Sequence, residues 1–596
     1  MRVAEFRHSL GLAAALLCAG AAPAAPAQQA VAPAQRAAGC THAGLKLPAG
    51  FCASVFADKV GHARHLAVAA NGTVYVNTWS GVYYDAVAVP AGGFVVALRD
   101  TTGRGRANLI ERFGPSAAQG GKGGTGIALY RGAVYVEEAD RIERYQLEPG
   151  SIVPSGKPAV IVSGLPLGGD HPMHPFAIDA DGMLYVDVAS ATNACQERNR
   201  QLHAPGITPC TELETRGGIW VYDANRTGQK FSPAERYATG IRNADGIAVA
   251  ASGHGIYATQ HGRDQLHENW PELYQPEEEA TQPAEELLHV SQGGDYGWPE
   301  CYFDEIQGKL VLAPEFGGDG GKALGPCAHK LAPLASFPAH WAPNDLIIYT
   351  GASFPARYRG GAFIAFHGSW DRAPYPQGGY NVVFQPLGAG EVADRSQCEV
   401  FAEGFARAVK EPGRARHRPS GVALAPDGAL FVADDRSGRI YRISYHGNSV
   451  AGANASGAFT PCPPPDAPAG AIGATSQRPP EGTHANAGAA ANLRVPPGTS
   501  RATLVLGEQV FQGRAGGAGC IGCHGSDGGG TPAGPKLSGP RWLWSDGSLA
   551  GLEQTIRAGV TTPRHYRDPM PPEGGAQLTD EQLRAVAAYV WALGHH

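Results

Sequence analysis

The stretch Asp181-Gly-Met-Leu-Tyr-Val186 leads from a glycine turn into a short strand with an aromatic residue near its centre. Similar stretches recur along residues 40–450, and the other five lie at 71–76, 132–136, 255–258, 361–365 and 427–432. Glycine turns followed by β-branched and aromatic residues are typical of antiparallel hairpins. Six copies at spacings of roughly 50 to 105 residues predict an all-β six-bladed β-propeller with four strands in each blade. A β-sandwich would account for the strands but not for six similar hairpins.

The composition agrees with a fold that is rich in turns. Glycine (82) and proline (47) are abundant among the 596 residues, which disfavours a helical bundle, and the 43% of hydrophobic residues can fill a core. The net charge is −6 and no basic stretch stands out, so we expect no nucleic-acid partner.

Residues 1–27 are predicted to be a secretory signal peptide. A positively charged start precedes an apolar run at residues 10–17, and Ala25-Pro-Ala27 fits a small-residue cleavage site. Cys18 lacks the small preceding residue that lipid attachment requires. No later segment has 18 uninterrupted apolar residues, so we expect no membrane span and a periplasmic or secreted protein.

The cysteines predict four disulfides. Of the 11 cysteines, Cys18 belongs to the signal peptide and Cys520 and Cys523 belong to a separate motif, which leaves eight in an oxidising compartment. Pairing of neighbours is the simplest of the possible arrangements, and buried thiols are the alternative. The expected pairs are Cys40–Cys52, Cys195–Cys210, Cys301–Cys327 and Cys398–Cys462.

Two further regions follow the propeller at 40–450. Residues 451–500 are rich in proline, alanine and glycine and are predicted to be a linker. Residues 501–596 carry helical signals and are predicted to form a second, smaller all-α domain. Its apolar spacing predicts a helix over 502–512, and the capping box Thr579-Asp-Glu-Gln582 opens another that ends near Leu593.

The motif Cys520-Ile-Gly-Cys-His524 has the spacing of c-type haem attachment. Cys520 and Cys523 would bond to the haem vinyl groups, and His524 would bind the iron. Met570, the only methionine downstream, is the expected sixth ligand, with His565 as the competing ligand and core packing as the alternative role of Met570. A zinc site would need a second cysteine or histidine pair nearby, and only His565 follows.

This segment of about 95 residues resembles a class I cytochrome c in the order of its helices, haem motif and methionine. The resemblance implies that the Pro535 carbonyl accepts the ring N–H of His524 and so orients the iron ligand.

Three polar clusters flank the propeller hairpins, in loops where functional residues of propellers gather. Asp170-His171-Pro-Met-His174 precedes the third hairpin, and Pro172 and Pro175 exclude a helical metal site there. The other two clusters are Arg242-Asn243-Ala-Asp-Gly246 and Gln260-His-Gly-Arg-Asp264.

Residues from roughly 45 to 445 resemble the glucose/sorbosone dehydrogenase family, six-bladed propellers that carry pyrroloquinoline quinone (PQQ). The markers, in chain order, are Gly169-Asp-His171, Gly240-Ile-Arg-Asn243, His261-Gly-Arg-Asp264, Asp295-Tyr-Gly-Trp-Pro299, His367-Gly-Ser-Trp-Asp-Arg372 and Arg418-Pro-Ser-Gly421. The resemblance implies that His171 is the general base, that Asp170 orients it, and that Arg242 and Asn243 contact the quinone.

The resemblance also implies a calcium ion, shared with PQQ and bound by the backbone carbonyls of Gly262 and Arg263. Arg263 stands where the family has proline, a change that a carbonyl ligand tolerates. Arg372 and Arg418 would pair with the carboxylates of PQQ. Arg372 falls near a family lysine, and Arg418 is a single arginine where a close pair is usual.

Together these features predict a quinohaemoprotein sugar dehydrogenase. It would oxidise an aldose, pyranose or sugar aldehyde by hydride transfer to PQQ and pass the electrons to the tethered haem c. His171 would take the hydroxyl proton, calcium would act as a Lewis acid, and Arg242 would stabilise the developing oxyanion.

The final acceptor would be a soluble cytochrome, a copper protein or a terminal oxidase, and Lys122 and Arg64 are open as further PQQ contacts. The alternative is a sugar- or protein-binding propeller with an electron-relay cytochrome. The eight-bladed quinohaemoprotein alcohol dehydrogenases are disfavoured because their adjacent cysteine pair does not occur in this sequence.

Overall fold

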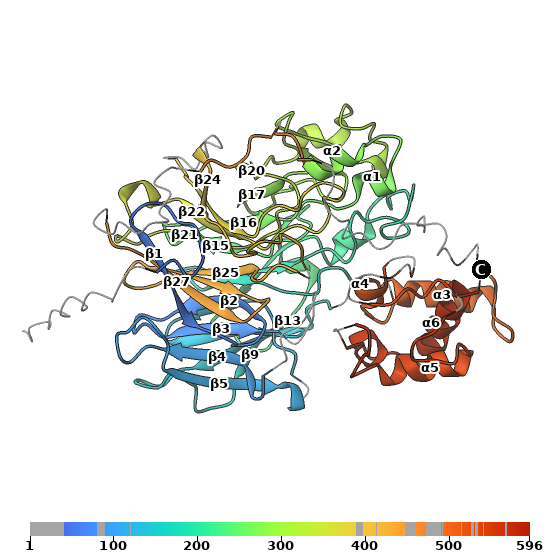
Figure 1. Ribbon diagram of the computed structural model, residues 1–596, viewed down its shortest axis with the longest axis horizontal. Coiled ribbons are helices and arrows are strands. Elements are labelled where there is room, and N and C mark those ends of the chain that lie inside the picture. The colour runs from blue at the N-terminus through green and yellow to red at the C-terminus, as the bar shows by residue number, and fades with distance from the viewer. Residues whose placement is uncertain are drawn as a thin grey trace, which may run out of the picture. The chain divides into compact units, whose positions relative to one another are not determined.

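The structure is a computed structural model and describes residues 41–79, 90–119, 121–167, 169–388, 397–412, 414–447, 460–465, 467–471, 490, 493–513, 515–525, 528, 530, 534–539, 541–566 and 569–595 (Figure 1). The predicted signal peptide, with Cys18, and also Cys40 lie outside the described residues.

Six β-sheets form the propeller, which confirms the predicted six-bladed fold. Five of these sheets have four strands. The remaining sheet has a short fifth strand, which pairs in parallel with its neighbour. The innermost strands of the six blades contact one another in a closed ring. A single β-sandwich has no such ring, so that alternative is wrong.

The first three blades use strands that follow one another along the chain, apart from one added strand. The first has β2 (Ala63–Val68), β3 (Val74–Thr78), β4 (Gly93–Arg99) and β5 (Leu109–Ser116). The second has β6 (Ile127–Tyr130), β7 (Ala133–Glu138), β8 (Arg141–Gln146), β9 (Ala159–Ser163) and the added β13 (Gln229–Lys230). The third has β10 (Phe176–Ile178), β11 (Met183–Val188), β12 (Gly218–Asp223) and β14 (Arg236–Thr239).

The remaining blades are built in the same way. The fourth has β15 (Ile247–Val249), β16 (Ile256–Gln260), β17 (Glu285–Val290) and β20 (Ala335–Phe337). The fifth has β21 (Pro343–Ile348), β22 (Ala362–Phe366), β23 (Asn381–Gln385) and β24 (Glu399–Ala402). The sixth has β25 (Pro419–Leu424), β26 (Leu430–Asp434), β27 (Arg439–Tyr445) and β1 (Phe51–Ala57). Loops of the fourth blade add α1 (Leu266–Asn269), α2 (Pro276–Thr281) and the hairpin β18 (Cys301–Asp304) and β19 (Lys309–Leu312).

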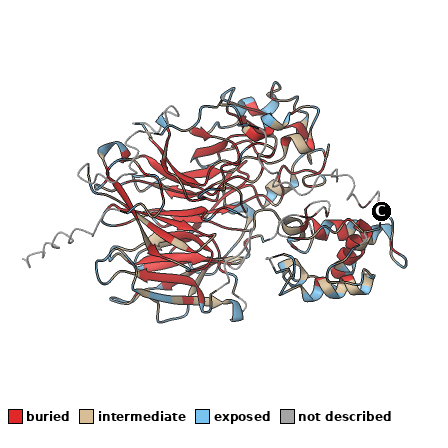
Figure 2. Cartoon of the chain, in the orientation of Figure 1, coloured by how far each residue is buried: buried red, intermediate tan, exposed pale blue. Residues whose placement is uncertain are grey.

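Each of the six repeated stretches forms the second strand of its blade, and each aromatic residue packs into the apolar cluster shared with the following blade. These residues are Tyr75, Tyr135, Tyr185, Tyr257, Phe363 and Phe431. Because strand side chains alternate, the neighbours of Phe363, Ala362 and Ile364, lie instead in the cluster shared with the preceding blade. The second strands are therefore largely buried, like most strands of the propeller in Figure 2.

The amino-terminal strand closes the ring. β1 pairs antiparallel with β27, with Phe51 opposite Tyr445 and Ala53 opposite Ile443. Phe51 packs edge-on against the rings of Phe354 and Phe401, at centroid distances of 4.8 and 5.0 Å. Closure by a distant strand covers the outer edge of β27 and completes the sixth blade.

Three of the predicted disulfides are present, Cys195–Cys210, Cys301–Cys327 and Cys398–Cys462. Cys52 is also disulfide-bonded, while its predicted partner Cys40 lies outside the described residues.

The carboxy-terminal domain is helical, with α3 (Arg501–Phe511), α4 (Cys520–His524), α5 (Leu549–Ala558) and α6 (Asp580–Leu593). Thr579 and Gln582 form the predicted capping box at the start of α6. A Cβ on Gly507 of α3 would lie 2.1 Å from the Ala585 carbonyl of α6, so glycine permits the close crossing of these two helices.

The linker boundaries at 451 and 500 need correction. Cys462 is bonded to Cys398, and Ala469 packs with Tyr375, so the described part of 460–471 belongs to the propeller. Ala490 and Leu493 are buried in the helical core, so that domain begins before residue 501. Composition alone missed these contacts because proline-rich chain can still be fixed by a disulfide.

Among the described residues, no helix combines the length and apolar character needed to cross a membrane.

Replacing the aromatic residue between two blades is expected to destabilise the propeller. Phe363→Ala removes a fully buried ring that lies 4.8 Å from Phe401 and 5.0 Å from Phe384, which should lower the free energy of unfolding by about 3–5 kcal/mol. Ile110→Ala, at a side chain that is 51% exposed on β5, is the control and should change it by less than about 0.5 kcal/mol. Denaturant unfolding measures both; equal effects would contradict this packing role.

Candidate functional site

The predicted polar residues all lie in loops at one end of the propeller. Asp170, Arg242 and Arg418 precede the innermost strands β10, β15 and β25, whereas Gly262 and Arg372 follow the second strands β16 and β22. Because these two strands are antiparallel in every blade, the start of one and the end of the other face the same side. The topology therefore brings segments that are far apart in sequence to one mouth of the ring.

His171 is held by the loop that follows β11. Its Nδ1 lies 2.9 Å from the Ser190 carbonyl oxygen and 3.0 Å from the Ser190 hydroxyl. Burial, and then the positive charges of Arg242 and Arg200, hold the pKa of His171 well below its usual value. The ring is therefore neutral at neutral pH, and its Nδ1–H can donate to Ser190 while Nε2 stays a base.

Asp170 has partners other than the one expected. Arg200 donates from Nε to Asp170 at 2.8 Å, and Asn199 donates at 3.2 Å, whereas the His171 ring bonds to Ser190. Asp170 thus fixes the backbone beside His171 through Arg200, and the hydrogen bond that orients the ring comes from Ser190.

Arg242 is almost fully buried, and each nitrogen of its guanidinium group donates a hydrogen bond to a protein oxygen. Nη2 donates to Asp264 at 2.8 Å, Nη1 donates to the Gly262 carbonyl at 2.9 Å, and Nε donates to the Asn193 carbonyl at 3.0 Å. Its own carbonyl accepts from the Ser190 amide at 2.7 Å, which links the Arg242 segment to the residue that holds His171.

Gly262 and Arg263, the expected calcium ligands, are fixed by buried acids. The amide of Gly262 donates to Glu285 at 2.9 Å, and the Arg263 guanidinium is ion-paired with Glu315. Since a carbonyl oxygen has two lone pairs, the Gly262 carbonyl can bind a cation as well as Arg242.

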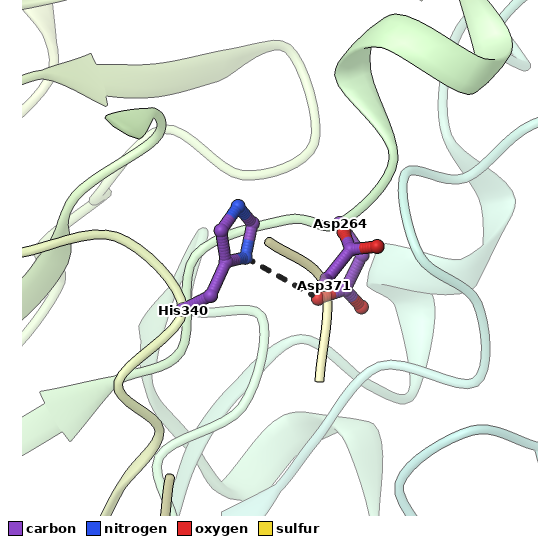
Figure 3. Close-up of side chains that lie close together, drawn as sticks. All are labelled: Asp264, His340 and Asp371. Carbon is purple, nitrogen blue, oxygen red and sulfur yellow. Dashed lines mark ion pairs between the residues drawn. The ribbon is translucent and has the colours of Figure 1, made fainter. Parts of the chain in front are cut away.

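Asp264 lies at the centre of the charged residues. Its Oδ2 accepts from Arg242 at 2.8 Å and from Arg200 at 2.9 Å, while Oδ1 lies 3.8 Å from His340 Nδ1. Burial alone would raise the pKa of Asp264, but the two arginines outweigh it and hold that pKa well below its usual range. Figure 3 shows Asp264, His340 and Asp371 close together, from three different loops.

Arg372 and Arg418 donate to backbone carbonyls. Arg372 Nε donates to Pro376 at 2.9 Å, and burial lowers its pKa to about 10. Arg418 donates to the carbonyls of His367 and Gly368, at 3.1 and 3.0 Å. Arg372 thus contacts its own loop and Arg418 contacts a neighbouring loop, in addition to any role toward a cofactor.

Arg64 and Lys122, the two further PQQ contacts that the sequence left undecided, differ in position. Arg64 is buried at the start of β2 and pairs with Asp435 at 2.9 Å and Asp245 at 3.3 Å. Lys122 has an exposed side chain, and its backbone amide donates to Glu138 at 2.8 Å. Of the two, Arg64 lies within the ring of inner strands.

The haem-attachment motif forms the short helix α4. Cys520 and Cys523 lie three residues apart on α4, and His524 at its end is buried. His524 Nδ1 lies 2.9 Å from the Pro535 carbonyl, so Nδ1 carries the hydrogen and Nε2 can bind iron, which confirms the expected contact. Burial lowers the pKa of His524, which also favours the neutral ligand.

Met570 lies in a loop that is fixed against α4. Its backbone pairs with Val560 in both directions, at 2.8 and 3.0 Å, and Gly574 of the same loop accepts from the amide of Gly519 at 3.0 Å. Met570 packs against the helical core, whereas His565 is exposed. The arrangement favours Met570 as the iron ligand over His565.

Several site residues had no role in the sequence interpretation. Asp264 and Asp371 stand inside quoted motifs, so their position in the motif was an available signal. No sequence signal marked Arg200, Ser190 or His340, because only the folded loops bring these residues to the mouth.

Comparisons with known proteins give a consistent result. A family model described as TrAA12-like matches residues 45–446, and one described as cytochrome c matches residues 504–594. A pyrroloquinoline quinone-dependent sugar dehydrogenase of Hypocrea jecorina is 25% identical over 224 residues, which are 34% of this chain and 46% of that protein. The chain spans half or less of the curated relatives that it matches.

Two solved structures share the propeller fold. The iodide structure of the Trichoderma reesei Carbohydrate-Active Enzymes Family AA12 has a TM-score of 0.53 at 18% identity, covering 69% of this chain and all of that one. The holo PQQ domain of pyranose dehydrogenase from Coprinopsis cinerea has a TM-score of 0.51 at 17% identity, covering 69% and 98%.

Replacement of Met570 is expected to change the haem potential without releasing the haem. Met570→His should keep the covalent attachment at Cys520 and Cys523 but lower the reduction potential, because imidazole stabilises ferric iron more than a thioether does. His565→Ala is the control and should leave the potential unchanged. Spectroelectrochemical titration distinguishes the two ligands: a shift only in the His565 variant would assign the iron to that histidine.

Proposed function

Because the chain belongs to the TrAA12-like family, we propose that it is a PQQ-dependent sugar dehydrogenase that delivers electrons to its own haem c. The observation that carries the proposal is the neutral His171, fixed at the same mouth as Arg242 and the Gly262 carbonyl. The similarity to a PQQ-dependent sugar dehydrogenase and to the PQQ domain of a pyranose dehydrogenase supports the substrate class.

The donor set at the mouth fits PQQ. Three guanidinium groups, those of Arg64, Arg242 and Arg418, are nearly buried there, and the Asn243 side chain is only slightly exposed. Guanidinium and amide donors match the carboxylates and quinone oxygens of PQQ. We assign Arg242 and Asn243 to the quinone, Arg372 and Arg418 to its carboxylates, and the carbonyls of Gly262 and Arg263 to a calcium ion.

Proton removal from the sugar is assigned to His171. With Nδ1 occupied by Ser190, Nε2 is the atom that can accept the hydroxyl proton. When bound, PQQ supplies the acceptor for the hydride. Arg200 and Asp170 fix the chain beside the base, and Arg242 places a positive charge where the oxyanion develops.

The cellular setting follows from the disulfides and the cytochrome c domain. Three disulfides in the described chain are consistent with an oxidising, periplasmic or extracellular compartment. A haem with histidine and methionine ligands suits transfer to a soluble cytochrome, a copper protein or a terminal oxidase.

Loss of the proposed base should slow the reaction without loss of PQQ. His171→Gln should lower kcat about 10²- to 10⁴-fold while the variant still binds PQQ, as followed by absorbance titration. Since burial and two arginines lower its pKa, the wild type should stay active as the pH falls below the usual histidine value of about 6.5. The exposed His254→Gln is the control. If His171→Gln is nearly as active as the wild type and His174→Gln is inactive, the base is His174 and the assignment to His171 is wrong.

Removal of the haem domain should separate sugar oxidation from electron delivery. A chain ending at residue 471 keeps the Cys398–Cys462 disulfide and should oxidise sugar with an artificial dye, but not reduce an added cytochrome. A full-length Cys520→Ser/Cys523→Ser variant, which retains the domain without covalent haem, is the matched control and should behave alike. Stopped-flow absorbance follows reduction of the haem after the wild type is mixed with sugar. If sugar never reduces the haem, electron delivery is contradicted. The alternative function, a sugar-binding propeller, would then be favoured.

A further inference from the structure

A cluster of metal-ligating side chains lies beside Arg242. One atom each of Asp264, His340 and Asp371 lies within 4.8 Å of the others (Figure 3). Asp264 follows β16, His340 precedes β21, and Asp371 follows β22, so the cluster joins loops of the fourth and fifth blades. The His340 and Asp264 side chains are 4% and 13% exposed.

His340 directs its Nδ1 toward the carboxylates of Asp264 and Asp371. Its Nε2 lies 2.8 Å from the Glu279 carbonyl and 3.1 Å from the Gln282 carbonyl. Carbonyl oxygens only accept, so Nε2 carries a hydrogen, and Nδ1, which lies 3.8 Å from Asp264 Oδ1, is the nitrogen that can bind a metal ion when the ion displaces its proton. Donation by the other ring nitrogen to a carbonyl is the usual support of a metal-bound histidine.

The carboxylates are already arranged with single oxygens facing the cluster. Asp264 uses Oδ2 for Arg242 and Arg200, which directs Oδ1 toward His340. Asp371 Oδ2 accepts from the Gln265 amide at 2.7 Å, which fixes the orientation of this carboxylate.

The surrounding charge favours a cation. Glu268 and Glu279 each place a carboxylate oxygen within 4.8 Å of Asp371, and the Glu279 side chain is buried. Burial, together with repulsion from Glu268, raises the pKa of Asp371 to about 7. Crowded carboxylates in a largely buried place need a positive charge among them.

We propose that Asp264, His340 and Asp371 bind a divalent transition-metal cation of the Zn²⁺ or Mn²⁺ class. The donor set of one imidazole and two carboxylates suits such ions, whereas calcium takes oxygen ligands alone. This site therefore differs from the calcium site assigned to the Gly262 and Arg263 carbonyls. A bound ion cross-links the two blades and fixes Asp264, whose other oxygen holds Arg242.

The test is Mn²⁺ binding to the full-length, metal-stripped protein without PQQ. Electron spin-echo spectroscopy should detect one nitrogen ligand, and labelling of histidine with ¹⁵N should replace the ¹⁴N signal. Asp371→Asn, which keeps the acceptor for Gln265, should weaken binding at least tenfold, and His340→Gln should remove the nitrogen signal. Asp319→Asn and His254→Gln are exposed controls outside the cluster and should bind as the wild type does.

Excess calcium separates this site from the assigned calcium site. The nitrogen-coupled Mn²⁺ signal should persist with calcium present, and its loss would mean that the two ions share one site, which would overturn the proposal. Absence of the nitrogen signal, or unchanged affinity in Asp371→Asn, would also overturn it. In that event the positive charge of the cluster is a proton on His340. Burial lowers the pKa of His340, but the carboxylates of Asp264 and Asp371 outweigh burial and raise that pKa to about 9. No result depends on sugar oxidation, so failure of this metal site leaves the proposed function intact.

Discussion

Packing between neighbouring blades is the interaction on which the rest of the structure depends. The second strand of every blade sends one aromatic side chain into the cluster shared with the following blade, from Tyr75 in the first blade to Phe431 in the sixth. The last of these interfaces exists only if the sixth blade meets the first, and β1 completes that blade by pairing with β27. Ring closure therefore couples the beginning and the end of the propeller. The loops at its mouth connect the strands of this ring, so the packing of the blades sets their positions.

The mouth combines a rigidly held histidine with a dense network of charged side chains. Ser190 contacts both His171, through its carbonyl and hydroxyl, and Arg242, through its amide. Arg200 joins Asp170 to Asp264, and the Cys195–Cys210 disulfide closes the loop that carries Arg200. Burial and the positive charge of this network lower the pKa of the imidazole and keep it neutral, which is the state that the proposed base needs.

The two folded regions are built by different local rules. In the propeller, alternation along strands gives every blade two apolar faces, whereas in the haem domain a capped amphipathic helix packs on a glycine-bearing one. The chain between them is shorter than its composition indicated, because Cys462 fixes its start to the propeller and Leu493 is buried in the helical core. Composition reports how a segment would behave alone and is silent about a covalent bond to a distant cysteine.

The sequence by itself determined the features that rest on local patterns. The repeated strand stretches predicted the six blades, the spacing of Cys520, Cys523 and His524 predicted haem attachment, and Thr579 with Gln582 predicted the start of α6. Local order along the chain specifies such elements because neighbouring residues form them. Only the tertiary structure decided that Ser190 orients His171, and that Asp264, His340 and Asp371 meet. The first contact joins two loops of the third blade and the second joins loops of the fourth and fifth blades, so both depend on the packing of strands that are distant in sequence.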